Sequence, residues 1–214
     1  MNKKIIISRI CACLLMLSVV SSSVMAAEGG PWSWRARIIQ VSPDDSSGEV
    51  TGIAGSGVSV DSDTTLEVDF TYMISANFGL ELILATTKHA ISGTGTLASL
   101  GQIASVGVLP PTLTAQYHFS PSKKVRPYVG LGLNYTLFYD ESTSGALALE
   151  SIELDSSVGL AAQAGVDFDI SKSWYANVDL KYIQIDTTAT VSNVGSVDVD
   201  INPLVLGVGV GMKF

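Results

Sequence analysis

Residues 125–139 read VRPYVGLGLNYTLFY, and this stretch decides the fold because its residue types alternate with a period of two. One set is apolar or aromatic and comprises Val125, Val129, Leu131, Leu133, Tyr135, Leu137 and Tyr139. The other set is mostly polar or small and comprises Arg126, Tyr128, Gly130, Gly132, Asn134 and Thr136. Successive side chains of a β-strand point to opposite faces, so the stretch predicts a strand with one apolar and one hydrophilic face.

The same alternation recurs along the chain and predicts eight strands in all. The other seven lie near residues 34–42, 66–74, 80–85, 112–119, 160–170, 174–185 and 204–214. Long connections (43–64, 88–106, 140–156 and 187–198) alternate with short ones (75–77, 120–124 and 171–173). An even strand number with this alternation predicts an all-β fold, namely an eight-stranded antiparallel transmembrane β-barrel with long extracellular loops and short periplasmic turns.

A soluble lipocalin-like barrel also has eight strands, but it would place its apolar face inward and its charges outside. Here the polar set carries the charges of Arg35, Arg37, Glu67, Asp69, Glu81, Arg126, Asp167, Asp169, Asp179 and Lys181, which suits a hydrated or ion-paired lumen. The aromatic residues of the apolar set fall near the two ends of the strands, as two membrane interfaces select. Both features favour the membrane barrel.

The first 26 residues have the pattern of a secretory signal peptide, and residues 27–214 would form the barrel. Lys3, Lys4 and Arg9 precede an apolar run that ends at a small-residue cleavage site after Ala26. Both cysteines lie in this segment, so the mature chain would lack disulfides and cysteine-based metal sites. Nine of the 12 Lys and Arg then remain against 20 Asp and Glu, and the net charge of −11 argues against nucleic acid as a partner.

Five stretches of the chain resemble the outer-membrane protein W (OmpW) family: FTYMISANFGLELILAT (70–86), LPPTLTAQYHF (109–119), RPYVGLGLNYT (126–136), AAQAGVDFDI (161–170) and IQIDTTA (183–189). The resemblance implies an eight-stranded barrel in the cell outer membrane with a partly apolar lumen that passes small hydrophobic molecules. Some similar proteins assist the uptake of alkanes or aromatic compounds. The terminal Phe214 resembles the signal that the barrel-assembly machinery reads.

Inward positions near the long loops are mostly apolar, and they predict an extracellular vestibule for a small hydrophobic solute. They are Ile39, Val41, Ile83, Ala85, Phe138, Ala161, Ile183 and Ile185. Apolar loop residues between 91 and 108 would add to this lining. The other interpretation is that these residues only pack under a lid of loops.

Inward positions near the short turns are charged, and they predict a floor below the vestibule. They are Glu67, Asp69, Arg126, Asp167, Asp169, Asp179 and Lys181. In a barrel of eight strands, which is wide enough only for its own side chains or one small ligand, such groups most simply pair and close the lumen. An ion-conducting lumen is the alternative.

Pro110 and Pro111 stand at the head of the fourth predicted strand, where neither residue has an N–H group for a sheet ladder. A solute above a closed floor needs another exit, so these prolines suggest a lateral opening toward the outer leaflet. The alternative is that they mark where the strand leaves the membrane.

A catalytic pair of His118 with Asp167 or Asp169 is one hypothesis, and a lumenal hydrogen-bond network is the simpler one, because no nucleophile motif or metal-ligand spacing accompanies either histidine. His89 would lie in a long loop, and His118 would point inward near Asp167 and Asp169. The acidic loops match no calcium motif but would approach divalent cations shared with lipopolysaccharide. Residues 145–154 are expected to form a short helix at the barrel mouth.

The sequence therefore predicts a non-enzymatic outer-membrane barrel, without cofactor or metal, that passes small hydrophobic compounds laterally into the outer leaflet. Its expected partners are membrane lipid, lipopolysaccharide, the solute and the assembly machinery. The rival hypothesis is a closed structural barrel whose loops bind a host surface, a phage or a bacteriocin.

Overall fold

The computed structural model describes residues 30–214, so the predicted signal peptide and its two cysteines lie outside the described residues. Helical structure in the described part consists of two single 3-10 turns, η2 (Ala98–Leu100) and η3 (Gly145–Leu147). No helix within residues 30–214 is long and apolar enough to cross a membrane.

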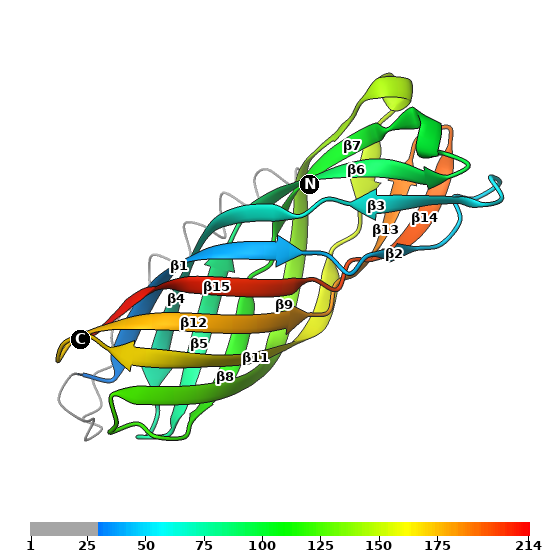
Figure 1. Cartoon of the computed structure of the whole chain (residues 1–214). Coiled ribbons are helices and arrows are strands. Elements are labelled where there is room, and N and C mark those ends of the chain that lie inside the picture. The colour runs from blue at the N-terminus through cyan, green and yellow to red at the C-terminus, as the bar shows by residue number, and fades with distance from the viewer. Residues whose placement is uncertain (1–29) are drawn as a thin grey trace.

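Eight antiparallel strands close a barrel (Figure 1). In barrel order they are β1 (Trp32–Ser42), β4 (Asp63–Met73), β5 (Phe78–Ala85), β8 (Thr112–His118), β9 (Val125–Thr143), β11 (Ser157–Asp169), β12 (Trp174–Ile183) and β15 (Leu204–Lys213). The barrel closes through the pairing of β15 with β1, in which Trp34 lies opposite Met212 and Val41 opposite Val205. The predicted fold class is confirmed.

The barrel is apolar outside and polar inside, as the alternating sequence predicts. On β9 the outward Leu131 and Leu133 are 72% and 61% exposed, whereas the inward Asn134 and Thr136 are fully buried. The same contrast recurs on the other strands, so the outer wall presents a band of aliphatic side chains to its surroundings. Such a band is suited to lipid and not to water.

Two inward glycines make room for large aromatic rings on neighbouring strands. Gly165 lies opposite Tyr128 and Gly211 lies opposite Tyr175, and in each pair a Cβ atom on the glycine would overlap the tyrosine ring. Both tyrosines are almost fully buried. The small residues on the polar face therefore allow bulky side chains to fill the narrow lumen.

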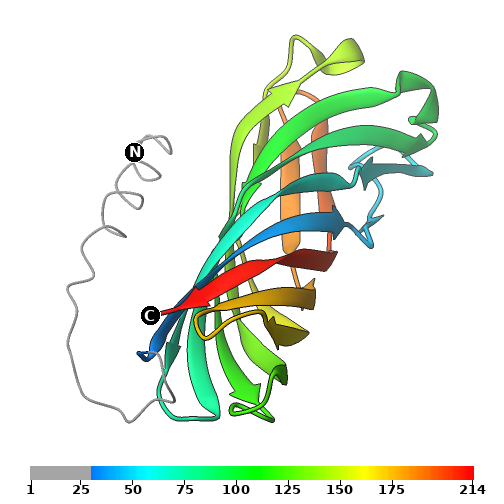
Figure 2. The same cartoon turned by 60° about the vertical axis from the view of Figure 1, so that its left-hand side comes forward.

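The long connections were predicted as loops, and this prediction is wrong for much of their length. They contain further strands, namely β2 (Ser46–Ser47), β3 (Ser56–Val60), β6 (Thr87–Gly95), β7 (Gln102–Leu109), β10 (Ile152–Leu154), β13 (Asp186–Val191) and β14 (Gly195–Asp200). β6 and β7 pair with each other and continue β5 and β8, so the wall extends beyond the barrel proper (Figure 2). The helix expected at residues 145–154 is replaced by the turn η3 and the strand β10.

Aromatic side chains gather at the opposite end of the barrel, where the short turns lie. Trp34 packs edge-on against Trp174 at 5.8 Å, and Tyr117 packs against both Phe78 and Phe119 at 5.0 and 5.1 Å. The terminal Phe214 exchanges backbone hydrogen bonds with Trp32 and remains half exposed. Its proposed role as an assembly signal would use this exposed ring.

Candidate functional site: an apolar cavity above a charged floor

Two arginines of β1 hold the centre of the charged floor. Arg35 Nη1 donates to Asp69 at 3.2 Å and to Glu81 at 2.8 Å. Arg37 donates from Nε to Glu67 at 2.7 Å and from Nη2 to Asp69 at 2.6 Å. All five side chains are at most 2% exposed, so their charges are compensated almost entirely by one another and by neighbouring polar groups.

The remaining predicted floor residues join the same network from the far strands. Lys181 donates to Glu67 at 2.8 Å and to Asp179 at 2.7 Å. Arg126 contacts Asp167 at 3.3 Å and forms a closer ion pair with Asp169. The structure thus brings all seven predicted floor residues together. At the centre of the network lie Arg35, Arg37 and Glu81, which the alternation assigned to the polar lumen but not to the floor.

An apolar cavity of about 190 Å³ lies above this floor, in the part of the molecule built by the barrel mouth and the extra strands. The carboxylate of Glu67 belongs to both features, because it lines the base of the cavity and pairs with two floor cations. Almost every other lining side chain is aliphatic.

Most of the predicted vestibule residues line this cavity, namely Ile39, Val41, Ile83, Ala85, Ile183 and Ile185. Phe138 and Ala161 do not line it, but both are buried in the surrounding apolar cluster. The extra strands supply further lining residues, among them Ile91, Val106, Leu154 and Val197. The loops expected only to cover the barrel therefore form much of the cavity wall.

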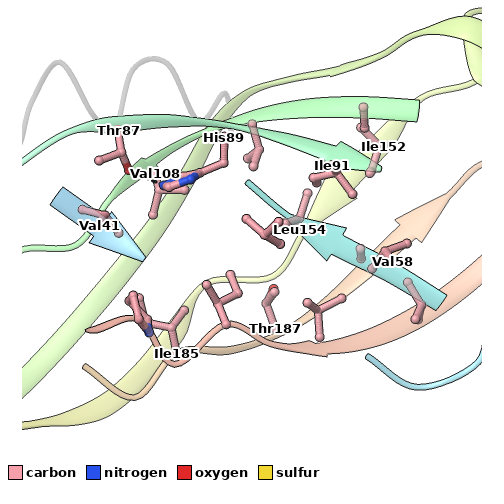
Figure 3. Close-up of a pocket in the computed structure, with 18 of the residues that line it drawn as sticks. Val41, Val58, Thr87, His89, Ile91, Val108, Ile152, Leu154, Ile185 and Thr187 are labelled. Atoms are coloured by element: carbon pink, nitrogen blue, oxygen red, sulfur yellow. Dashed lines mark hydrogen bonds between the residues drawn. The ribbon is translucent and has the colours of Figure 1, made fainter. Parts of the chain in front are cut away.

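A small polar corner interrupts the apolar lining (Figure 3). His89 and Thr87 both point inward from β6, and Thr87 Oγ1 lies 2.8 Å from His89 Nε2. His89 Nδ1 lies 2.6 Å from the carbonyl oxygen of Asp61. The prediction that placed His89 in a loop was wrong, because the alternation of β6 extends beyond the point where a loop was expected.

Pro110 and Pro111 lie between β7 and β8, at a break in the wall. Ile83 pairs with Thr112 below the break and Thr87 pairs with Val108 above it, so residues 84–86 and 109–111 are outside both ladders. The other side of the prolines is bonded, because Tyr135 N donates to the Pro111 carbonyl oxygen at 3.0 Å. The interruption therefore lies on the β5 side, and Pro110 also lines the cavity.

The outer surface beside this break carries a polar link between Thr86 and Tyr139. Their hydroxyl groups are hydrogen-bonded, and Thr86 Oγ1 also donates to the Val108 carbonyl oxygen at 3.3 Å. The Tyr139 ring lies over Gly107, where a Cβ atom would overlap it. The link crosses over β7 and connects Thr86, at the edge of the break, to Tyr139 on β9.

His118 does not form the pair with Asp167 or Asp169 that was considered from the sequence. Its Nε2 lies 3.1 Å from Gln116 Oε1, and its ring packs 5.2 Å from the Tyr128 ring. Asp167 is bound by Arg35, Arg126 and Asn177. Within residues 30–214 no group of three or more His, Cys, Asp or Glu side chains is arranged to hold a metal ion.

Beyond the barrel, a hydrogen-bonded tether joins two segments that cover the cavity. Glu150 accepts hydrogen bonds from Ser192 Oγ at 2.8 Å and Asn193 Nδ2 at 3.0 Å. These donors favour the charged form and lower the pKa of Glu150 below its ordinary value. The tether links the segment after η3 to the β13–β14 turn.

A closed eight-stranded barrel with an aliphatic outer band and a hydrogen-bonded polar interior defines the chain as an outer-membrane β-barrel protein. The OmpW family model matches residues 28–214, and the chain belongs to the OmpW family. It is located in the cell outer membrane, as its relatives are.

Three relatives illustrate the similarity. Outer membrane protein W of Vibrio cholerae serotype O1 is 40% identical over 214 residues, covering 96% of this chain and 98% of the relative. The crystal structure of the outer membrane protein OprG from Pseudomonas aeruginosa matches with a TM-score of 0.81 and 34% identity over 90% of this chain and 99% of that one. The dibenzothiophene metabolism operon protein PahQ of Pseudomonas aeruginosa is 26% identical over 94% of this chain and 97% of its own length.

Proposed function

We propose that the protein passes small hydrophobic molecules from the cell exterior into the outer leaflet of the outer membrane. The observation that carries this proposal is the apolar cavity, which is bounded below by paired charges and reaches Pro110 at the break in the wall. A solute in the cavity gains from burial of apolar surface. No catalytic step is part of the proposal.

The floor supports a sideways route and not a route through the barrel. A hydrophobic solute that continued downward would have to separate Glu67 from Arg37 and Lys181 while offering no hydrogen bonds in return. Leaving a buried charge without its partner costs several kcal/mol, roughly 3–5 in comparable cases. A solute that leaves between residues 84–86 and 109–111 would break no ladder hydrogen bonds, because these two segments are not paired with each other.

The name of PahQ, a relative from an operon of dibenzothiophene metabolism, agrees with an apolar aromatic solute. The proposed partners are therefore a small hydrophobic molecule and the lipid into which it is released. Lipopolysaccharide around the acidic loops and the barrel-assembly machinery acting on Phe214 remain further proposed partners.

The test is uptake of a lipophilic fluorescent reporter by proteoliposomes that contain the protein. Replacing Pro110 with Val and Pro111 with Thr restores both backbone N–H groups. The Pro111 carbonyl points toward Tyr135 of β9, so the restored N–H of residue 110 is the one that points toward β5 across the break. Uptake should slow several-fold while the barrel still folds. Heat-modifiable migration in SDS gels checks folding. Unchanged uptake by the folded double variant would contradict the lateral route, and no uptake by the unmodified protein would favour the structural or surface-binding alternative.

A further inference from the structure

We infer that the cavity prefers apolar molecules that carry one hydrogen-bond donor, such as an aliphatic alcohol or a phenol, over equally sized ketones and ethers. The inference rests on the proposed function and refines its substrate class. It follows from where each polar hydrogen of the cavity lining is directed.

The tautomer of His89 is determined by its contact with the backbone. The Asp61 carbonyl oxygen has no hydrogen and can only accept, so the hydrogen at 2.6 Å belongs to His89 Nδ1. In a neutral imidazole the other nitrogen then lacks a hydrogen and accepts. The Thr87 hydroxyl, 2.8 Å away, must therefore donate its only hydrogen to His89 Nε2.

The other hydroxyl groups of the lining are committed in the same way. Thr187 Oγ1 donates to the Asp155 carbonyl oxygen at 2.7 Å, and Thr112 Oγ1 donates to the Pro110 carbonyl oxygen at 3.0 Å. Each hydroxyl has one hydrogen and two lone pairs. Their hydrogens are directed into the wall. Thr112 Oγ1 also accepts from Asn134 Nδ2 at 2.9 Å and keeps one lone pair, whereas Thr187 Oγ1 keeps its full accepting capacity.

Glu67 completes the polar lining and carries a carboxylate, which only accepts while it is ionised. Its Oε1 accepts hydrogen bonds from Arg37 and Lys181 in the floor. Across the described residues, the polar side chains lining the cavity therefore present acceptors and no uncommitted hydrogen. The two floor cations nearest the cavity, Arg37 and Lys181, direct hydrogens at the Glu67 carboxylate.

A solute meets this lining differently according to its own polar group. A hydroxyl group can donate to Thr87 Oγ1 in a site that is almost entirely aliphatic, where the hydrogen bond is not exposed to water. A ketone or ether oxygen finds no side-chain donor in the lining and loses its hydrogen bonds with water. An aliphatic carboxylate faces the same oxygens with a negative charge and is disfavoured further.

The experiment compares 1-octanol, 2-octanone and 1-methoxyheptane, which have equal numbers of heavy atoms. Each is titrated at pH 8 into the protein in lipid nanodiscs, and binding is followed through the methyl NMR signals of Ile83, Ile91, Ile183 and Ile185. Free concentrations are corrected with partition coefficients measured on empty nanodiscs. The alcohol should bind about fivefold more tightly than the ketone or the ether, as expected for one net hydrogen bond.

A pair of variants locates the preference. His89→Phe keeps a ring and removes Nε2, so it frees the Thr87 hydrogen to donate; ketone binding should improve and the ratio should fall toward one. Thr87→Ser keeps the hydroxyl group and should keep the ratio. Equal affinities in the unmodified protein, or a ratio unchanged in His89→Phe, would overturn the inference while solute binding itself stands. If none of the three molecules shifts the isoleucine signals, the proposed function fails as well.

Discussion

Lys181 Nζ lies 2.8 Å from Oε1 of Glu67, the carboxylate at which the charged floor and the apolar cavity meet. The same oxygen accepts from Arg37, and Lys181 also holds Asp179 at 2.7 Å. These contacts join β1, β4 and β12 across the lumen. The pair therefore both closes the cavity from below and links β4 to β12, which are not neighbours in the barrel wall.

Replacing Lys181 with Met should destabilise the barrel by about 3 kcal/mol, because two buried carboxylates lose a donor that nothing replaces. Urea unfolding in lipid vesicles measures the change. Adding Glu67→Gln to Lys181→Met neutralises one of the two carboxylates that lose this donor, so the double variant should lose less than the sum of the single variants. Strict additivity would show that the pair is not coupled.

The floor should also control ion flow. Arg37→Ala combined with Asp69→Ala removes one cation and one anion of the floor that do not line the cavity, which keeps the net charge and leaves a water-accessible gap beside Arg35 and Glu67. Single-channel recordings in planar bilayers should then show a severalfold rise in conductance over the unmodified protein. Uptake of the hydrophobic reporter should stay within about twofold, since its proposed route does not cross the floor. A parallel change in uptake would place the solute route through the lumen.

The hydroxyl link between Thr86 and Tyr139 should slow the lateral step. Tyr139→Phe removes the link while keeping the ring over Gly107, so reporter uptake should become about two- to fivefold faster, as expected for the loss of one hydrogen bond. Tyr135→Phe, on the same outward face of β9, is the matched control and should leave the rate unchanged. Equal effects of both changes would remove any specific role of the link.

The barrel strands can be predicted from the sequence because the alternation of apolar and polar residues is a local property. The face of β9 that holds Leu131 and Leu133 and the face that holds Asn134 can both be assigned without any knowledge of neighbouring strands. The vestibule and floor residues were predicted from whether each inward position lies near the long-loop end or the short-turn end of its strand. Six of the eight predicted vestibule residues line the cavity.

The features that could not be predicted from the sequence depend on contacts between distant strands. Arg35 contacts Asp167, which is 132 positions away in the sequence, and Arg37 contacts Asn177, which is 140 positions away. The centre of the floor could therefore be predicted only with knowledge of how the strands are aligned in the barrel. β6 and β7 carry glycines and serines that weaken their alternation, and they were therefore predicted as a loop. That error concealed His89 and Thr87, although both fall on the alternating inward positions of β6.

The most direct test of the lateral route is a reversible cross-link across the break. The described residues contain no cysteine, and both cysteines of the chain lie in the predicted signal peptide. By continuation of the register between Ile83–Thr112 and Thr87–Val108, Leu84 faces Pro111. Leu84→Cys with Pro111→Cys, joined by a short bis-methanethiosulfonate, would hold the two edges together.

Leu82→Cys with Leu113→Cys is the matched control, since this pair lies within the existing ladder of β5 and β8. Reporter uptake into proteoliposomes is measured before cross-linking, after it, and after reduction with dithiothreitol. Cross-linking at the break should lower uptake at least fivefold and reduction should restore it, while the control pair shows no change. Uptake that continues unchanged with the break cross-linked would contradict lateral release.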